Sequence, residues 1–289
     1  MAKLKKIPVI IWIGSTNKGE SFFRKLFLPV IKLMITKSSI IIVYGTEAKK
    51  FVERLEAKER RIFIAYNTVP INHILATPKP KQKIYFKETK NILFVGRLIK
   101  IKGIDTLISA FKLLKSKINN SRLLIVGEGK QLHFLKKKCE NLQIEKDVEF
   151  LGFLEGKDLT KIYQTADLFV LPSRWEIWGL VLNEAMAHGL PVIATNSCGA
   201  STDLIYPGLN GYVIPPNDPV ILMKACNKIL SNNNRAKKMG EYSKDIIKEF
   251  TIEKEAQAFI EAIKFILVNT KRQRDLKIDD NVKNYHIEK

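Results

Sequence analysis

Two stretches of the chain carry charged side chains in patterns that suit phosphate and sugar binding. The first is FVGRLIKIKGID, Phe94–Asp105, in which Arg97 and Lys102 follow an apolar run that ends at Gly96. The run predicts a buried strand, and the residues after it predict a helix that begins near Gly103. Arginine presents a planar fork of donors and lysine a compact charge, and both suit phosphate oxygens beside a helix start. The pattern therefore predicts a diphosphate site, with two solvated cations as the alternative when it is taken in isolation.

The second stretch is RWEIWGLVLNEAMAH, Arg174–His188, which contains two glutamates separated by seven residues. We predict a helix over Leu180–His188 with Glu184 about one turn from its start, while Glu176 lies in the loop before it. A carboxylate on the helix can accept hydrogen bonds from ribose hydroxyls, and one in the loop can accept them from a sugar. Two surface glutamates are the alternative for this spacing alone. Backbone groups at the helix start are further candidate contacts, because glycine admits a close ligand and the first amides of a helix are unpaired: Gly179, Leu180 and Val181.

Strands and helices must position these residues, and the second part of the chain contains a regular alternation of both. Apolar runs alternate with amphipathic helices of about ten residues, which predicts a parallel sheet covered on both faces. The predicted strands are Asn91–Val95, Arg122–Val126, Leu168–Leu171 and Pro191–Thr195, and later helices are predicted at Pro219–Leu230, Arg235–Glu249 and Ile252–Val268. Ligands of open α/β sheets bind at the carboxyl ends of the strands. Arg97 and Glu176 each follow one of these strands, as that rule requires.

In the first 87 residues the sequence pattern predicts a smaller group of strands and helices. Strands are expected at Pro8–Ile13, Ile40–Val43 and Arg61–Ala65, with helices at 19–35 and 46–57 between them. A Pro/Lys-rich linker, ATPKPKQK, ends this part at Ala76–Lys83. We therefore expect four regions: a partial N-terminal domain at 1–87, a main domain at 88–250, a C-terminal helix at 251–268 that packs back on the N-terminal part, and a polar tail at 269–289 that frays.

Charge and composition narrow the classes of partner and the compartment. The formal net charge is +20, and residues 1–87 hold 18 lysines and arginines against 5 acidic residues, which predicts anionic partners. No helix-turn-helix, zinc-binding or RNA-binding signature is present, so we expect no nucleic-acid partner. The 3 cysteines have no paired or metal-like spacing, which favours the cytoplasm. No apolar run reaches the length of about 18 residues that a membrane-spanning helix needs.

A basic and apolar helix near the N-terminus is open to two interpretations. SFFRKLFLPVIKLMITKSSI, Ser21–Ile40, interleaves apolar residues with Arg24, Lys25, Lys32 and Lys37. Lys25 and Lys32 are seven residues apart and so fall on one helical face. The segment is either a core helix or an interfacial helix of the kind that lies on an anionic bilayer. We expect a peripheral, salt-sensitive contact with the anionic, cytoplasmic face of a membrane.

In this order and spacing, GRLIKIKG, LLIVGEG, FLGF and LPSRWEIWGLVLNEAMAHGLPVIAT resemble the glycosyltransferase family 4 group, from about Asn91 to Leu230. Members of that family are retaining enzymes with the two-domain GT-B fold. The resemblance implies an α/β fold of GT-B type, with a Rossmann-like C-terminal domain on a parallel sheet and a truncated, acceptor-side Rossmann-like N-terminal domain. It implies retaining transfer of a sugar from a nucleotide-diphosphate sugar to an acceptor hydroxyl, in lipid-linked or cell-envelope glycan synthesis.

The resemblance also implies a role for each candidate residue. Arg97 and Lys102 would hold the donor diphosphate, Glu184 would bind the ribose, and Glu176 would contact the donor sugar. Arg97, Lys102 and Glu176 form the implied catalytic set. The other implied donor contacts are Gly96, Gly127, Glu128, Phe153, Gly179, Leu180 and Val181. No cofactor and no metal are implied, because the cations and helix amides take the place of a metal ion at the leaving diphosphate.

The chain departs from the family in two places. Cys198-Gly199-Ala200 and Asp203 stand where Gly-Gly and a later glutamate are usual, and Asp203 keeps the charge. The N-terminal part resembles the later half of the family's first domain, without the histidine that many members place near the reacting sugar. The 4 histidines of this chain do not replace it convincingly: His73, His133, His188 and His286. A second hypothesis therefore stays open, namely a catalytically weak nucleotide-sugar-binding subunit, or a truncated product, that needs a partner chain.

Overall fold

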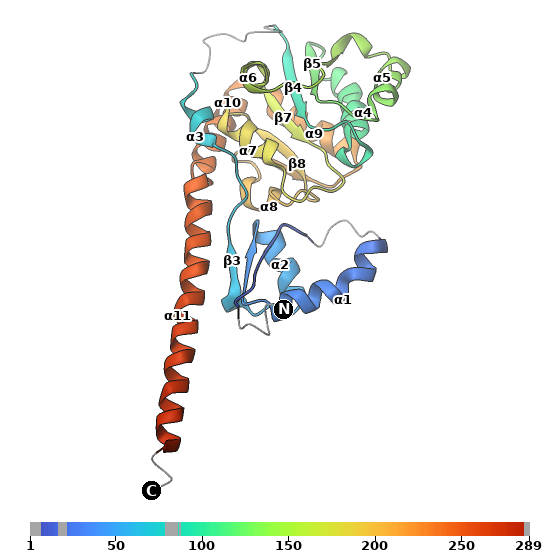
Figure 1. Ribbon diagram of the computed structural model, residues 1–289. Coiled ribbons are helices and arrows are strands. Elements are labelled where there is room, and N and C mark those ends of the chain that lie inside the picture. Colours follow the sequence, from blue (N-terminus) through green and yellow to red (C-terminus); the bar gives the residue numbers. More distant parts are fainter. Residues whose placement is uncertain (1–6, 17–21, 79–85, 87, 286–289) are drawn as a thin grey trace. The chain divides into compact units, whose positions relative to one another are not determined.

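The computed structural model describes residues 7–16, 22–78, 86 and 88–285, and within these the side chains of all residues except 22–25 and 269–285. The chain divides into two compact units (Figure 1). Residues 67–252 form the central unit, and residues 1–66 with 253–289 form the N-terminal unit. The division falls at residue 66 rather than at the predicted linker, most of which lies outside the described residues. The predicted domain limits stay a prediction.

The central unit is built on a six-stranded sheet in the order β6-β5-β4-β7-β8-β9, and each neighbouring pair of strands is parallel. The strands are β4 (Lys90–Val95), β5 (Ser121–Val126), β6 (Val148–Phe150), β7 (Leu168–Leu171), β8 (Val192–Thr195) and β9 (Gly211–Ile214). Every residue of β7 and β8 is buried, as expected for strands covered by helices on both faces. The predicted parallel α/β architecture is confirmed. The short strands β6 and β9 at the two edges were not predicted.

Helices connect these strands and cover the sheet. They are α3 (Ile71–Ala76), α4 (Ile104–Lys115), α5 (Leu132–Asn141), α6 (Gly156–Thr165), α7 (Leu180–Ala187), α8 (Ser201–Leu204), α9 (Pro219–Leu230) and α10 (Asn233–Ile247), with short 3-10 turns η2 (Lys100–Lys102) and η3 (Glu145–Asp147). The start of α9 shows how local sequence sets these bounds. Asp218 accepts hydrogen bonds from the amides of Val220 and Ile221, and Pro219 occupies the first helical position.

The N-terminal unit contains a three-stranded parallel sheet in the order β1-β2-β3. Its elements are β1 (Ile10–Ile13), α1 (Phe22–Lys37), β2 (Ile40–Val43), α2 (Thr46–Arg54), η1 (Glu59–Arg61), β3 (Ile62–Ile64) and α11 (Ile252–Tyr285). Ile41 and Val43 of β2 face a core shared with α1 and α2. Ile40 and Ile42 face the opposite way, onto Ala262 and other apolar residues of α11. One strand thus supplies two cores, because its side chains alternate.

Two details of the helices concern the predictions from sequence. The C-terminal helix does not end at Val268 but continues to Tyr285. Residues 269–285 contain neither glycine nor proline, so their polar character does not stop the helix. Within the described residues, no helix combines the length and the apolar character needed to cross a bilayer.

Candidate active site

The order of the strands marks one edge of the central sheet as the place for a ligand. β4 and β7 are neighbours, and the chain proceeds from β4 outward to β5 and β6 but from β7 outward to β8 and β9 on the other side. At such a switch point the loops after the two strands diverge and leave a crevice at the carboxyl ends. Residues 96–103 follow β4, and residues 172–179 follow β7. These two loops hold five of the predicted site residues: Gly96, Arg97, Lys102, Glu176 and Gly179.

Lys102 and Glu176 form an ion pair at this edge, although 74 residues separate them in the chain. The Lys102 ammonium donates to Glu176 Oε2, and the two side chains are 15% and 18% exposed. The amide of Glu176 also donates to the Ser197 carbonyl at 3.1 Å, so the loop that carries the carboxylate is held by the sheet's next loop. In this partly buried position the ammonium can bind an anionic group of a ligand. The carboxylate beside it can accept hydrogen bonds from hydroxyl groups of the same ligand.

Arg174 holds the lysine loop against the glutamate loop. Its Nη2 donates to Asp105 Oδ2 at 2.7 Å and its Nε to Asn217 Oδ1 at 2.6 Å, while Nη1 donates to the Lys100 carbonyl. Its backbone amide donates to the Ile101 carbonyl at 2.7 Å. Burial raises the pKa of Asp105, but the hydrogen bond and charge of Arg174 outweigh burial and leave that pKa below its ordinary value. The sequence alone did not indicate this role of Arg174.

Glycines allow the loops at this edge to meet backbone to backbone. Gly103 has φ of +66°, and a Cβ there would overlap the carbonyl oxygen of Pro172. Gly127, which follows β5, has φ of +128°, and a Cβ there would overlap the carbonyl oxygen of Gly96. Because side chains rarely adopt such φ values and no room exists for them, glycine is required at both positions. The carboxyl ends of β4, β5 and β7 are therefore closely packed.

Glu184 lies on α7 behind the same edge and is held by a residue from another helix. Tyr163 of α6 donates its hydroxyl hydrogen to Glu184 Oε2 at 2.8 Å. The Tyr163 side chain is buried, and its ring stacks on His188 with 4.8 Å between centroids and 16° between planes. Burial raises the pKa of Glu184, and the Tyr163 hydrogen bond lowers it in part. The sequence contained no signal for Tyr163, since nothing in a spacing of 21 residues shows that two helices meet.

The start of α7 presents backbone donors and is fixed by a buried cysteine. Gly179, with φ of +102°, precedes the helix, and in the described part of the chain the amides of Leu180 and Val181 have no assigned acceptor. The Cys198 thiol donates to the Trp178 carbonyl at 2.7 Å. Burial raises the pKa of that thiol to about 12, so it stays protonated and can donate. The cysteine that departs from the family pattern thus holds the segment before α7.

The remaining predicted residues are placed at the same edge but without contacts that define a role. Arg97 is exposed after the end of β4, and its carbonyl accepts the Ile99 amide at 3.0 Å, while its guanidinium has no hydrogen bond or ion pair to another described residue. Glu128 is exposed, while its carbonyl accepts the Leu98 amide at 2.7 Å. Phe153, beyond β6, is 66% exposed. Two polar atoms that sequence analysis overlooked are buried without a partner among the described residues: Ser173 Oγ and Trp175 Nε1. Buried polar atoms are usually hydrogen-bonded to protein, to ordered water or to a ligand.

A comparison with protein families identifies this arrangement. The family described as glycosyl transferases group 1 matches residues 77–246, which is more than half of the chain. The chain belongs to this family.

Individual glycosyltransferases agree with that assignment. An uncharacterized glycosyltransferase of Methanocaldococcus jannaschii is 36% identical over 188 residues, which cover 60% of this chain and 48% of the relative. The chain spans between 41% and 62% of the length of the curated relatives it matches, with 58% and 59% for two others. The sequence predicted a parallel α/β fold of GT-B type. Similar solved structures of glycosyltransferases confirm this prediction of the fold. Anabaena HepE, in complex with UDP, has a TM-score of 0.80 at 20% identity and covers 91% of this chain and 74% of its own. WaaG, a glycosyltransferase involved in lipopolysaccharide biosynthesis, has a TM-score of 0.72 at 19% identity and covers 87% of this chain and 74% of its own.

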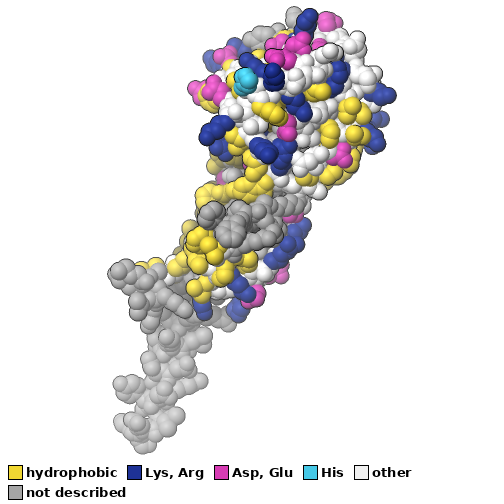
Figure 2. Space-filling model, turned by 90° about the vertical axis from the view of Figure 1, so that its right-hand side faces the viewer, with side chains coloured by type: hydrophobic (Ala, Val, Ile, Leu, Met, Phe, Trp, Pro, Cys, Tyr) yellow, Lys and Arg dark blue, Asp and Glu magenta, His cyan; other side chains and the backbone are white. Residues whose placement is uncertain are grey.

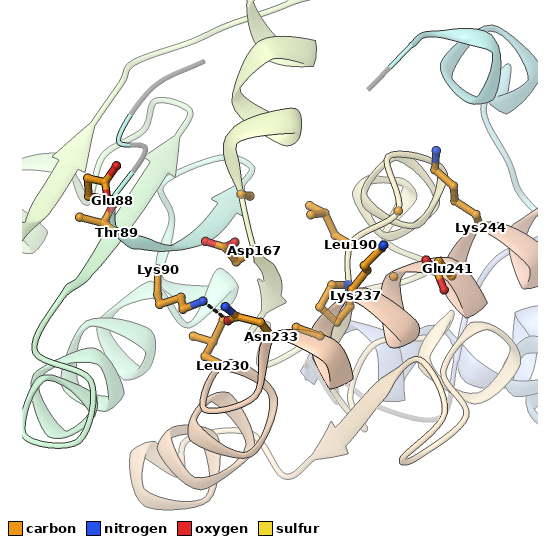
Figure 3. Close-up of a pocket in the computed structure, with 15 residues that line it drawn as sticks. Glu88, Thr89, Lys90, Asp167, Leu190, Leu230, Asn233, Lys237, Glu241 and Lys244 are labelled. Carbon is orange, nitrogen blue, oxygen red and sulfur yellow. Dashed lines mark hydrogen bonds between the residues drawn. The ribbon is translucent and has the colours of Figure 1, made fainter. Parts of the chain in front are cut away.

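The central unit also has a cavity of about 490 Å³ that lies away from these residues. Figure 3 shows its lining, which comes from the start of β4, the residues before β7 and β8, and one face of α10. Three cations and three carboxylates share it: Lys90, Lys237, Lys244, Glu88, Asp167 and Glu241. The charges balance, and the cavity lies at the amino ends of the strands. Neither property suits a diphosphate ligand in a sheet of this kind, so the carboxyl edge is the better candidate.

Proposed function

We propose that this glycosyltransferase binds a nucleotide-diphosphate sugar at the carboxyl ends of β4 and β7. We further propose that it transfers the sugar, with retention of configuration, to an acceptor hydroxyl in the manner of glycosyltransferase family 4. The observation that carries the proposal is the partly buried ion pair of Lys102 and Glu176 at the switch point of the sheet. HepE, which has a similar fold, is described in complex with UDP and with UDP-glucose, which supports a nucleotide-sugar donor here.

Cationic and backbone donors are proposed to stabilise the leaving diphosphate. Lys102 and Arg97 approach from the loop after β4, and the amides of Leu180 and Val181 point from the start of α7. As the bond between sugar and diphosphate breaks, negative charge grows on the diphosphate oxygens. Donors already fixed in place stabilise that charge without reorganising, which is usually the largest catalytic contribution. In this proposal the cations do the work of a metal ion, and the reaction needs no cofactor.

The two glutamates are proposed to bind different parts of the donor. Glu184 accepts hydrogen bonds from the ribose hydroxyls, and Tyr163 keeps its carboxylate oriented toward them. Glu176 accepts hydrogen bonds from hydroxyls of the transferred sugar while it stays paired with Lys102, so sugar and diphosphate are aligned together. The unpartnered atoms Ser173 Oγ and Trp175 Nε1 are further donors for this ligand. Backbone and side chains at the ends of β5 and β6 flank the base: Gly127, Glu128 and Phe153.

The acceptor is proposed to be a lipid-linked or cell-envelope glycan, handled on the cytoplasmic side. WaaG is described as acting in lipopolysaccharide biosynthesis, and its fold is similar. In this proposal residues 1–87 contribute to the acceptor side. Because the chain spans only part of its relatives' length, the activity of the whole protein belongs to the proposal.

A thermal-shift screen of UDP-, GDP- and ADP-sugars tests donor binding. A ligand at a hundred times its dissociation constant stabilises the folded state by about 2.7 kcal/mol, which is a readily measured shift of several degrees. We expect one nucleotide to give such a shift and the sugar-free monophosphate to give a smaller one. No shift with any of the three nucleotide classes would contradict the proposal.

A further inference from the structure

One face of α1 is apolar and uncovered. Five large apolar side chains on this helix are between 52% and 61% exposed: Leu26, Phe27, Val30, Leu33 and Met34. Their spacings of three, four and seven residues place them on one side of the helix. The opposite side is occupied by Leu28, Ile31 and Ile35, which pack into the core shared with β2 and α2. We call the five exposed residues the α1 apolar face.

Folded domains rarely expose a contiguous apolar face of this size without a use for it. Figure 2 shows hydrophobic side chains gathered together on the described surface, with Lys and Arg side chains beside them. Pro29 lies inside the helix and does not interrupt it, because α1 runs from Phe22 to Lys37. The side of α1 that carries Leu28, Ile31 and Ile35 belongs to a core, which was one of the two alternatives from the sequence, and the α1 apolar face is the side to which the other alternative could apply.

The stretch of sequence that contains α1 carries a surplus of positive charge. Residues 1–66 hold 14 lysines and arginines and 5 glutamates, a balance of +9. The four glutamates of this stretch that the structure describes are all paired with lysines: Glu47 with Lys50, Glu53 and Glu59 with Lys49, and Glu56 with Lys32. Lys32 is thus occupied by an ion pair rather than turned to a partner. Among the described residues, the exposed cations that contribute to this surplus include Lys37 at the end of α1, Lys58 and Arg60.

Arg61 is held at the carboxyl end of α1. Its Nη1 donates to the carbonyl oxygens of Thr36 and Ser38, at 3.3 Å and 2.6 Å. A second cation therefore sits beside Lys37 at the last turn of the helix. A helix with an apolar face and flanking cations lies in the headgroup region of an anionic bilayer, with apolar side chains directed at the acyl chains and cations at lipid phosphates.

We propose that the α1 apolar face is a docking surface for an anionic membrane. Charge decides between this occupant and a second copy of the chain. Two copies joined through the same face would bring like surplus charges together, which is unfavourable, whereas an anionic lipid surface complements them. The docked glycosyltransferase is a peripheral protein, since docking through one half-exposed helix face immerses side chains and not a spanning segment.

Vesicle co-sedimentation of the full chain tests this surface. The vesicles are pure phosphatidylcholine, or phosphatidylcholine with phosphatidylglycerol, each at low and high salt. We expect sedimentation with the anionic vesicles that falls as salt increases, and little with the neutral ones. The double variant Phe27→Ser/Leu33→Ser should lose about tenfold or more of its partitioning, because two large apolar side chains no longer leave water.

The matched control is Phe134→Ser/Leu113→Ser, which removes the same two residue types from exposed positions on α5 and α4 of the central unit. It should sediment like the unaltered chain, and both variants should melt as the unaltered chain does. Recovery in the supernatant under all conditions would overturn the proposal, as would equal losses in the two variants. A vesicle-free dimer that dissociates in the α1 variant would assign the face to a second copy and overturn it as well.

Discussion

The hydroxyl of Tyr163 donates to Glu184 Oε2 at 2.8 Å and so joins α6 to the helix that carries the proposed ribose ligand. Because this hydrogen bond lowers the pKa of Glu184 against the effect of burial, Tyr163→Phe should raise that pKa further. Nucleotide binding that needs the carboxylate should then weaken, and its loss on acidification should begin at a higher pH.

Calorimetric titrations of the nucleotide across pH 5 to 8 measure this shift for Tyr163→Phe and the unaltered chain. Glu184→Gln is the control, since it should bind weakly and without the same dependence on pH. A profile for Tyr163→Phe that coincides with that of the unaltered chain would show that Tyr163 fills space and does not position the carboxylate.

Removing either proposed diphosphate cation should weaken nucleotide-diphosphate binding. A hydrogen bond to a charged group contributes about 1.5–3 kcal/mol, so Arg97→Ala and Lys102→Ala should each lower affinity about tenfold or more. Lys100→Ala is the matched control, because its side chain is exposed in the same loop and has no assigned role. Calorimetry that finds unchanged affinity in both Arg97→Ala and Lys102→Ala would remove the diphosphate assignment.

Substitution of Glu184 and substitution of Glu176 should impair different properties, namely nucleotide affinity and sugar transfer. Glu184→Gln should weaken binding of the free nucleotide about tenfold, because it alters the proposed ribose contact. Glu176→Gln should leave that affinity much closer to normal and reduce sugar transfer instead, since it touches the transferred sugar and the lysine beside it. Free-nucleotide affinity and turnover are measured for each variant. Equal loss of nucleotide affinity in both would contradict the division of roles.

The Arg174–Asp105 contact should stabilise the protein in a manner that depends on pH. The pKa of Asp105 in the folded state lies below the unfolded value of about 3.9. Its contribution to stability is therefore fully present above pH of about 4 and is lost as pH falls through the folded pKa. Asp105→Asn should lower the free energy of unfolding at pH 7 by about 1–3 kcal/mol, and by progressively less as the pH drops.

Denaturant titrations at pH 7 and near pH 3 measure that difference. In an Arg174→Ala background the Asp105→Asn change should have little effect at either pH, because the partner is already gone. A difference in stability between the unaltered chain and the Asp105→Asn variant that does not vary with pH would mean that the carboxylate is not what the arginine recognises.

Much of the central unit was predictable from sequence because its strands are continuous apolar runs. Asn91–Val95 and Leu168–Leu171 were predicted to within one residue, and the charged residues that follow them do lie at one edge. The local sequence indicated β6 and β9 less clearly. These strands are three and four residues long and lie at the edges of the sheet. Short edge strands are stabilised by their neighbours, so a pattern within them is weak.

The contacts that hold the site were beyond sequence reasoning for a related reason. Arg174 reaches Asp105, and Tyr163 reaches Glu184, from positions 69 and 21 residues away. Each contact depends on how two elements pack, and no spacing in the chain records it. The end of α11 was placed too early in the chain, at Val268 rather than Tyr285, because the residues after Val268 are polar although they include no helix-breaking residue.

The proposed donor site lies at the carboxyl edge of the sheet and not in the cavity at its amino edge. Calorimetric titration of the nucleotide sugar that stabilises the chain tests this placement with two double variants. Lys102→Ala/Glu184→Gln alters the proposed site, and Lys237→Ala/Lys244→Ala removes two lysines from the cavity. We predict that the first variant loses at least about a hundredfold in affinity and that the second binds like the unaltered chain. Loss of affinity in the cavity variant, with normal binding in the site variant, would contradict the account.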